Sequence, residues 1–273
     1  MNDLFRYRDL GLEYVSYGSG DDVIFAFHGF GRKNSDFSIF EKHLKPGQRI
    51  IAINLFAHSR SEFPADRIEN DPLTKSEWRA CMLAMMQHFG IEKFHLLGYS
   101  MGGRICLTTM EIMPEFVKSV LLLAPDGLKI NVLYRFASGT KLGRRMYRSI
   151  IEKPVGLFRI AKWLNKLGFL NDKLHRFVHV HLDTREKRQQ VHDGWLIYKS
   201  MFPDLEKTAA IIREEKIKFN MIFGKFDSVI TPNLGMKFSK MIGTDKHLHV
   251  VEAGHRLLDA NTIDFIIKSG CWP

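Results

Sequence analysis

Short apolar runs alternate with amphipathic segments along the first half of the chain. Runs of strand length occur at residues 23–27, 49–54, 94–97 and 117–124. Between the second and third runs, residues 74–89 carry apolar side chains at three- and four-residue spacing, which predicts a helix. Continuous apolar runs bounded by turn residues are typical of parallel strands that helices cover on both faces. The pattern therefore predicts strands joined by helical crossovers.

The alternation returns near the end of the chain. Residues 219–223 and 247–251 read as strands, and residues 233–241 and 257–269 read as helices. Strands that alternate with helices over most of a chain favour a doubly wound α/β fold.

The middle of the chain breaks this pattern, because no clear strand occurs between about residues 127 and 213. The segment is helical in pattern, basic and rich in large side chains. We therefore expect a core formed by residues 1–127 and 213–273, with residues 128–212 inserted as a helical cap.

The composition is typical of a soluble globular protein and indicates little else. The 273 residues are 45% hydrophobic and 26% charged, as in ordinary globular proteins. The cysteines Cys81, Cys106 and Cys271 are odd in number and form no CxxC pair, which argues against a disulfide framework or a zinc site. The chain begins with polar and charged residues and has no apolar run of membrane-spanning length, so we expect a cytoplasmic protein.

The sequence Gly98-Tyr99-Ser100-Met101-Gly102 stands between an apolar strand and a helical pattern. In a G-x-S-x-G motif the serine occupies a sharp, strained turn, and the flanking glycines remove side chains that would collide there. The pattern also occurs by chance as a glycine-rich turn, but its place after a strand favours Ser100 as a nucleophile.

A serine nucleophile needs a base to remove its proton and an acid to orient that base. His255 follows the strand at residues 247–251, and Asp227 follows the strand at residues 219–223. Both therefore fall at carboxyl ends of strands, where open α/β sheets bind ligands. Asp126, just after the strand at residues 117–124, remains an alternative acid.

The first strand runs into His28-Gly29-Phe30-Gly31, where glycines let the backbone approach a ligand closely. We expect the amides of Phe30 and Met101 to form an oxyanion hole. The substrate pocket is expected to include His28, Gly29 and Tyr99.

The motifs HGFG, GYSMGG, GKFD and GH occur in an order that resembles the alpha/beta-hydrolase superfamily. The resemblance covers roughly residues 10–127 and 213–270. It implies a mostly parallel eight-stranded sheet flanked by helices, with a helical cap inserted after the sixth strand. Residues 54–61, NLFAHSRS, depart from the D-x-P-G-x-G-x-S turn of many relatives, which leaves open the roles of His58 and Arg60.

The resemblance implies a serine hydrolase that cleaves a carboxylic ester and needs no cofactor or metal. Relatives also cleave carbon–carbon bonds, thioesters, amides or lactones, and some bind ligands without catalysis. Relatives that act on halides or epoxides use an aspartate as nucleophile, and Ser100 argues against both reactions.

Positive charge is concentrated in the middle of the chain, which accounts for the net charge of +10. Residues 129–190 hold fifteen Lys or Arg residues against four acids. This segment predicts either contact with an anionic small molecule or lipid surface, or simply a solvated helical face. No nucleic-acid-binding motif accompanies the charge, so we expect no nucleic-acid partner.

Overall fold

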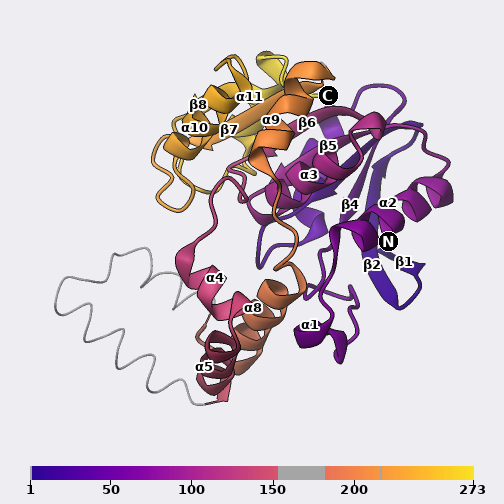
Figure 1. The fold of residues 1–273 in the computed structure, drawn as a ribbon. Coiled ribbons are helices and arrows are strands. Elements are labelled where there is room, and N and C mark those ends of the chain that lie inside the picture. The colour runs from indigo at the N-terminus through magenta and orange to yellow at the C-terminus, as the bar shows by residue number, and fades with distance from the viewer. Residues whose placement is uncertain (1, 153–181, 216) are drawn as a thin grey trace. The chain divides into compact units, whose positions relative to one another are not determined.

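The computed structural model describes residues 2–152, 182–215 and 217–273 (Figure 1). The chain divides into two compact units. The core unit comprises Met1–Pro64, Leu73–Lys129 and Ser200–Pro273, and the second unit comprises Ala65–Pro72 and Ile130–Lys199. Residues 200–212, expected in the insertion, thus belong to the core unit, because helix α9 (Leu205–Glu214) packs on α3 and α10.

The core unit is built on one eight-stranded sheet with the order β1-β2-β4-β3-β5-β6-β7-β8. The strands are β1 Asp3–Tyr7, β2 Leu10–Gly18, β3 Asp22–Phe27, β4 Gln48–Ile53, β5 Phe94–Tyr99, β6 Val117–Leu123, β7 Lys218–Gly224 and β8 Leu248–Val251. Strand β2 pairs antiparallel with β1 and β4, and all other pairs are parallel. The sheet is therefore mixed but mostly parallel, as expected.

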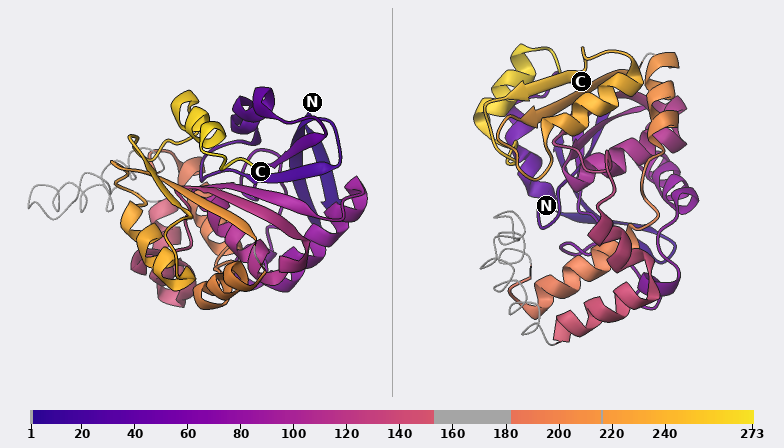
Figure 2. Two further views of the ribbon diagram at one scale, coloured as in Figure 1. Left: turned by 90° about the horizontal axis from the view of Figure 1, so that it is seen from above. Right: turned by 60° about the vertical axis from the view of Figure 1, so that its left-hand side comes forward.

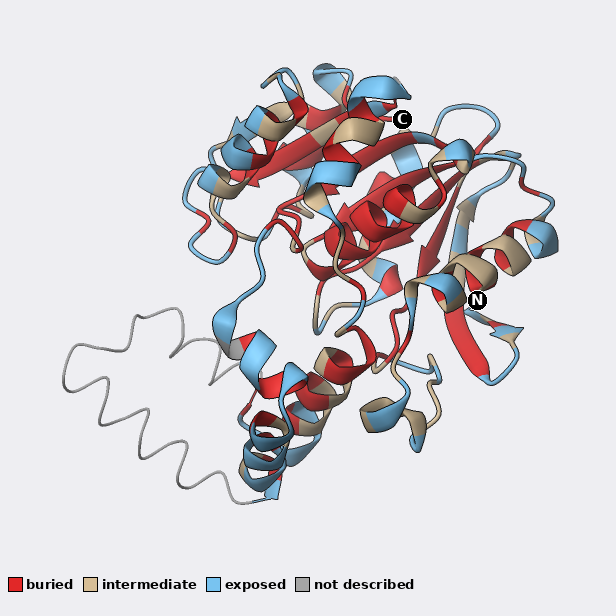
Figure 3. Cartoon of the chain, in the orientation of Figure 1, coloured by how far each residue is buried: buried red, intermediate tan, exposed pale blue. Residues whose placement is uncertain are grey.

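Helices cover both faces of this sheet (Figure 2). The 3-10 helix η1 (Asn34–His43) and α11 (Ala260–Lys268) lie on one face, and the remaining long helices of the core unit lie on the other. The latter are α2 Lys75–Phe89, α3 Met101–Ile112, α9 and α10 Pro232–Ile242, and the short η2 (Pro114–Phe116) precedes β6. Every residue of α3 except Ile112 is buried, and burial is continuous from this helix into the central strands (Figure 3).

Local sequence explains where these helices start and stop. Thr74 caps α2 by accepting a hydrogen bond from the Glu77 amide at 3.1 Å, and Gly90 ends it with a φ of 67°. Pro232 begins α10, and Gly243 ends it with a φ of 87°. Asp259 caps α11 through the Thr262 amide, so this helix begins three residues later than the apolar pattern suggested.

The second unit contains α1 (Arg67–Asn70), α4 (Val132–Gly139), α5 (Lys141–Glu152) and α8 (Arg185–Ile197). Helices α4 and α5 pack closely because Gly143 has no side chain where a Cβ would lie 2.1 Å from the Phe136 carbonyl oxygen. The helices expected between residues 153 and 181 lie outside the described residues. Among the residues that are described, no helix combines the length and the apolar character needed to cross a bilayer.

Candidate active site

Ser100 occupies the turn between β5 and α3. Its backbone has a φ of 52° and a ψ of −115°, a conformation that side-chain-bearing residues rarely adopt. The Ser100 amide donates to the Leu123 carbonyl at 2.9 Å, and the Ser100 carbonyl accepts from the Asp126 amide at 2.9 Å. These bonds to β6 and to the loop that follows it hold the turn in its strained form.

Glycines make this turn sterically feasible. A Cβ on Gly102 would lie 1.8 Å from the Phe27 carbonyl oxygen, and one on Gly98 would lie 2.7 Å from the Cys106 sulfur. The first contact is with the backbone of β3, which cannot move aside without disturbing the sheet. The glycines of the motif are therefore required by packing around the serine.

His255 joins Ser100 to Asp227. Its Nε2 lies 3.2 Å from Ser100 Oγ, and its Nδ1 lies 2.7 Å from Asp227 Oδ2. The Asp227 side chain is completely buried, while that of His255 is 26% exposed. The three residues stand at the carboxyl ends of β5, β7 and β8, so parallel strand order brings together side chains that are far apart in sequence.

The hydrogen bonds assign a tautomer to this histidine. Asp227 can only accept, so His255 carries its proton on Nδ1 and leaves Nε2 to accept the Ser100 hydroxyl proton. The other carboxylate oxygen, Asp227 Oδ1, accepts from the amides of Val229 at 2.7 Å and Ile230 at 2.9 Å. The carboxylate is thus fixed on both sides, and the arrangement matches a base held by an acid.

Asp126, the alternative acid, has different neighbours. Its Oδ1 accepts from the Gly127 amide at 2.8 Å, and its Oδ2 lies 3.6 Å from Nε of the buried Arg104. The acid that contacts His255 is thus Asp227. The side chain of Asp126 contacts its own loop and Arg104 of α3.

The loop after β3 lies against the nucleophile. A Cβ on Gly29 would be 3.1 Å from Ser100 Cβ and equally close to the Tyr99 ring, so any side chain here would be tightly packed against the nucleophile turn. Met101 begins α3, and its amide therefore lacks an acceptor within the helix. The Phe30 and Met101 backbones thus belong to the two segments that adjoin Ser100.

Two residues expected to line the pocket, His28 and Tyr99, are buried and make hydrogen bonds within the protein. His28 is fully buried, with Nε2 accepting from the Leu55 amide at 3.0 Å and Nδ1 donating to the Gly29 carbonyl. Burial, reinforced by the neighbouring His58 ring, lowers the pKa of His28 to about 3. Tyr99 is 6% exposed and donates from its hydroxyl to the His255 carbonyl at 3.1 Å. Both side chains therefore make their contacts inside the protein, next to the site.

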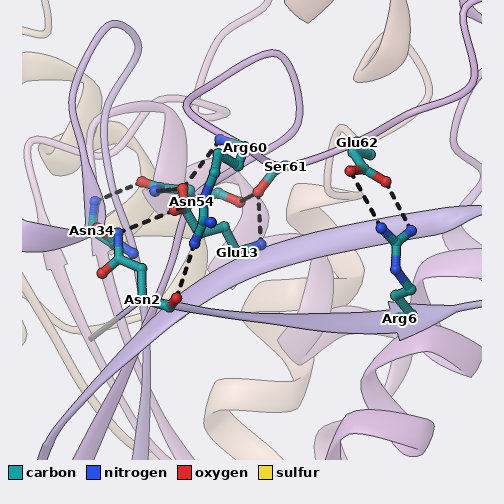
Figure 4. Close-up of polar contacts among 8 residues, drawn as sticks. All are labelled: Asn2, Arg6, Glu13, Asn34, Asn54, Arg60, Ser61 and Glu62. Atoms are coloured by element: carbon teal, nitrogen blue, oxygen red, sulfur yellow. Dashed lines mark hydrogen bonds and ion pairs between the residues drawn. The ribbon is translucent and has the colours of Figure 1, made fainter.

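Glu13, at the centre of a polar cluster that includes Arg60, was not predicted from the sequence. Glu13, buried in β2, accepts hydrogen bonds from Asn2, Asn54 and Arg60 (Figure 4). His58, in the atypical turn after β4, is also buried and accepts from the Gly31 amide. The only signal for these residues was the departure of residues 54–61 from the usual turn.

Comparisons with known proteins agree with this fold. A family model described as alpha/beta hydrolase fold matches residues 22–169, more than half of the chain. The chain therefore belongs to the alpha/beta hydrolase fold family.

Three relatives illustrate the range of this family. The chain is 32% identical over 125 residues to a dihydrolipoyllysine-residue acetyltransferase component of an acetoin cleaving system from Pseudomonas putida, a match that covers 46% of this chain and only 31% of that protein. It is 23% identical to a 2-hydroxy-6-oxononadienedioate/2-hydroxy-6-oxononatrienedioate hydrolase from P. putida, over 90% of this chain and 86% of that one. A thermophilic esterase from Thermogutta terrifontis shares the fold, with a TM-score of 0.66 and 16% identity over 99% of this chain and 97% of that one.

The basic segment is only partly described, because six of its fifteen basic residues lie within residues 153–181. Among the described ones, Arg148 pairs with Glu69, Arg185 with Glu152, and Lys187 with Asp183. Arg188 is buried and donates to the carbonyls of Ile151 and Leu182. Part of the charge is therefore used within the second unit, and contact with an anionic surface stays a prediction.

Proposed function

We propose that this protein is a serine hydrolase that cleaves a carboxylic ester through an acyl-enzyme on Ser100. The observation that carries the proposal is the continuous series of hydrogen bonds from Asp227 through His255 to Ser100. A serine hydroxyl is a weak nucleophile, and this series supplies both a base and the group that orients it.

In the acylation step, Ser100 Oγ attacks the ester carbonyl carbon while His255 Nε2 takes the hydroxyl proton. The buried carboxylate of Asp227 stabilises the imidazolium that forms. Collapse of the tetrahedral intermediate breaks the bond to the alcohol oxygen, and His255 returns the proton to that leaving group. An ester then joins Ser100 to the acyl group.

In the deacylation step, water replaces the alcohol. His255 Nε2 removes a proton from the water as it attacks the acyl carbon, and the proton then passes to Ser100 Oγ. The amides of Phe30 and Met101 are assigned to hold the oxyanion in both steps, since they belong to the two backbone segments next to the serine. Such donors act mainly in the transition state.

A second candidate is hydrolysis of a carbon–carbon bond next to a carbonyl group. It is favoured by the likeness to the 2-hydroxy-6-oxononadienedioate hydrolase, which extends over 90% of this chain. The serine, histidine and acid would serve both reactions, so the substrate alone separates the two candidates.

The test is hydrolysis of p-nitrophenyl esters with acyl chains from two to sixteen carbons, together with fluorophosphonate labelling. Ser100→Ala is compared with Ser35→Ala, which removes an exposed hydroxyl. We expect Ser100→Ala to lose turnover and labelling while Ser35→Ala retains both. Labelling of Ser100 without turnover of any ester would favour the second candidate or a ligand-binding role, and the absence of both in the wild type would contradict a serine hydrolase.

A further inference from the structure

Three hydrogen bonds tie the turn after β4, residues 54–61, to the loop after β3. The Leu55 amide donates to His28 Nε2 at 3.0 Å, the Gly31 amide donates to His58 Nε2 at 2.9 Å, and the Asn34 amide donates to Asn54 Oδ1 at 2.7 Å. These contacts bracket Gly29 and Phe30 on both sides. The position of the loop beside Ser100 is therefore set by the turn at residues 54–61.

His58 is held in the form that can accept this bond. Its Nδ1 lies 3.0 Å from the Phe56 carbonyl oxygen, which can only accept, so the proton is on Nδ1 and Nε2 carries a lone pair toward Gly31. His58 is 3% exposed, and its ring packs edge-on against the rings of His28 and Phe30, with centroids 4.9 Å and 5.1 Å away. Packing and hydrogen bonds thus fix the ring in one orientation.

The turn itself depends on one buried carboxylate (Figure 4). Glu13 Oε2 accepts from Asn54 Nδ2 at 2.7 Å and from the Arg60 amide at 3.1 Å, and Oε1 accepts from Arg60 Nε at 2.8 Å. Ser61 adds a bridge, since its hydroxyl donates to the Asn54 carbonyl and accepts from the Glu13 amide. Both ends of the turn are therefore fastened to the middle of β2.

This fastening opposes strain in the turn. Ala57 and Ser59 have φ values of 64° and 50°, in the left-handed region that glycine adopts without cost. A turn with two such residues would relax if its ends were released. The Glu13 contacts thus keep His58 within reach of the Gly31 amide.

We propose that His58 and Glu13 are positioning residues for the oxyanion-binding amide of Phe30. His58 fixes the peptide that follows Phe30, and Glu13 fixes the turn that carries His58. Neither residue touches the reacting atoms. The inference rests on the proposed function, because it assigns the Phe30 amide to the oxyanion.

The first experiment compares His58→Leu with His58→Gln, whose side-chain carbonyl can still accept from the Gly31 amide. Oxyanion donors act in the transition state, so we expect His58→Leu to lower kcat by roughly 10- to 100-fold with KM changed by less than about threefold. His58→Gln should recover kcat to within about fivefold of the wild type. Equal losses in both variants, or a loss confined to KM, would overturn the proposal.

Glu13→Gln tests whether Glu13 fixes the turn that carries His58, with Glu62→Gln as its control. Glu62 directly follows the turn and pairs with Arg6, but that pair is exposed. We expect the fall in kcat with unchanged KM only in Glu13→Gln. Equal activity of these two variants would mean that Glu13 does not help to position the Phe30 amide.

Native-state amide hydrogen exchange, followed by mass spectrometry over residues 28–34, gives a readout that needs no substrate. The His58→Leu and Glu13→Gln proteins should exchange this segment at least tenfold faster than the wild type, and Glu62→Gln should not. Unchanged exchange in all variants would overturn the proposal even if turnover fell. A wild type that turns over no ester would contradict the proposed function, and the exchange rates alone would then decide the roles of His58 and Glu13.

Discussion

The backbone of Ser100 is strained, and Gly102 is the residue that lets the chain form this turn. We expect Gly102→Ala to destabilise the protein by at least about 3 kcal/mol, because the new methyl group would overlap the Phe27 carbonyl on β3. Urea unfolding gives the measurement. Gly139→Ala is the control, since an added Cβ there has no neighbour within 4 Å and alanine favours a helix. Similar unfolding midpoints for the two variants would contradict this account of the turn.

Substitution of the two candidate acids tests which of them orients the histidine. We expect Asp227→Asn to lower kcat by roughly 1,000- to 10,000-fold, because an amide at this position favours the wrong tautomer of His255. Asp126→Asn should lower kcat by less than about tenfold, since its carboxylate contacts Gly127 and Arg104. Ester turnover under saturating substrate measures both. The reverse order of effects would assign the acid to Asp126.

At the scale of single residues, the sequence predicts those candidate site residues whose chemistry restricts them to a few positions in the fold. Ser100, Asp227 and His255 each follow an apolar run, and strand order alone places such residues at one edge of the sheet. Glu13 gives no comparable signal, because its partners Asn54 and Arg60 are 41 and 47 positions away. The contacts of His28 could not be predicted for a related reason, since its hydrogen bond to Leu55 depends on the turn after β4.

Helix α2 offers a test of how local sequence sets an element. Thr74 is exposed, and its hydroxyl accepts from the Glu77 amide and lies 3.1 Å from the Ser76 hydroxyl, so replacing it affects only the start of the helix. We expect Thr74→Ala to lower the free energy of unfolding by about 1 kcal/mol, and Thr74→Ser to change it by less than about half of that. Urea unfolding at neutral pH would detect the difference. Equal stability of the two variants would show that the cap contributes nothing.

The strands of the sheet differ in how clearly the sequence pattern predicts them. Strands β3 to β7 are buried on both faces, so they read as continuous apolar runs. Strand β1 is an edge strand with a single buried residue, Phe5, and β2 carries Glu13 within its buried half. Polar residues in these positions hide both strands from a search for apolar runs. The apolar pattern alone therefore misses β1 and β2, and the total of eight strands was predicted from the family resemblance.

Acid should weaken the whole protein, in part because the buried groups Glu13 and His28 titrate abnormally. Burial opposes ionisation of Glu13, but hydrogen bonds from Arg60, Asn54 and Asn2 outweigh it and lower its pKa from 4.5 to about 2. The charged carboxylate therefore stabilises the fold fully above about pH 4.5, and this stabilisation is lost as the pH falls toward 2. Burial lowers the pKa of His28 from 6.5 to about 3, so its neutral form stabilises the fold above 6.5 and stability falls below that pH.

Glu13→Gln separates these two contributions. We expect a loss of about 3 kcal/mol in the free energy of unfolding at pH 7, because the variant removes a buried charge while leaving its donors in place. That loss should stay nearly constant down to about pH 4.5 and shrink at lower pH, where Glu13 of the wild type also becomes protonated. The decline between pH 6.5 and 4.5, to which His28 contributes, should remain in both proteins. Urea unfolding from pH 7 to 3 measures the difference, and Glu62→Gln, which alters an exposed pair, serves as the control. A difference between Glu13→Gln and the wild type that did not change with pH would mean that shape, and not charge, is what Glu13 contributes to the turn.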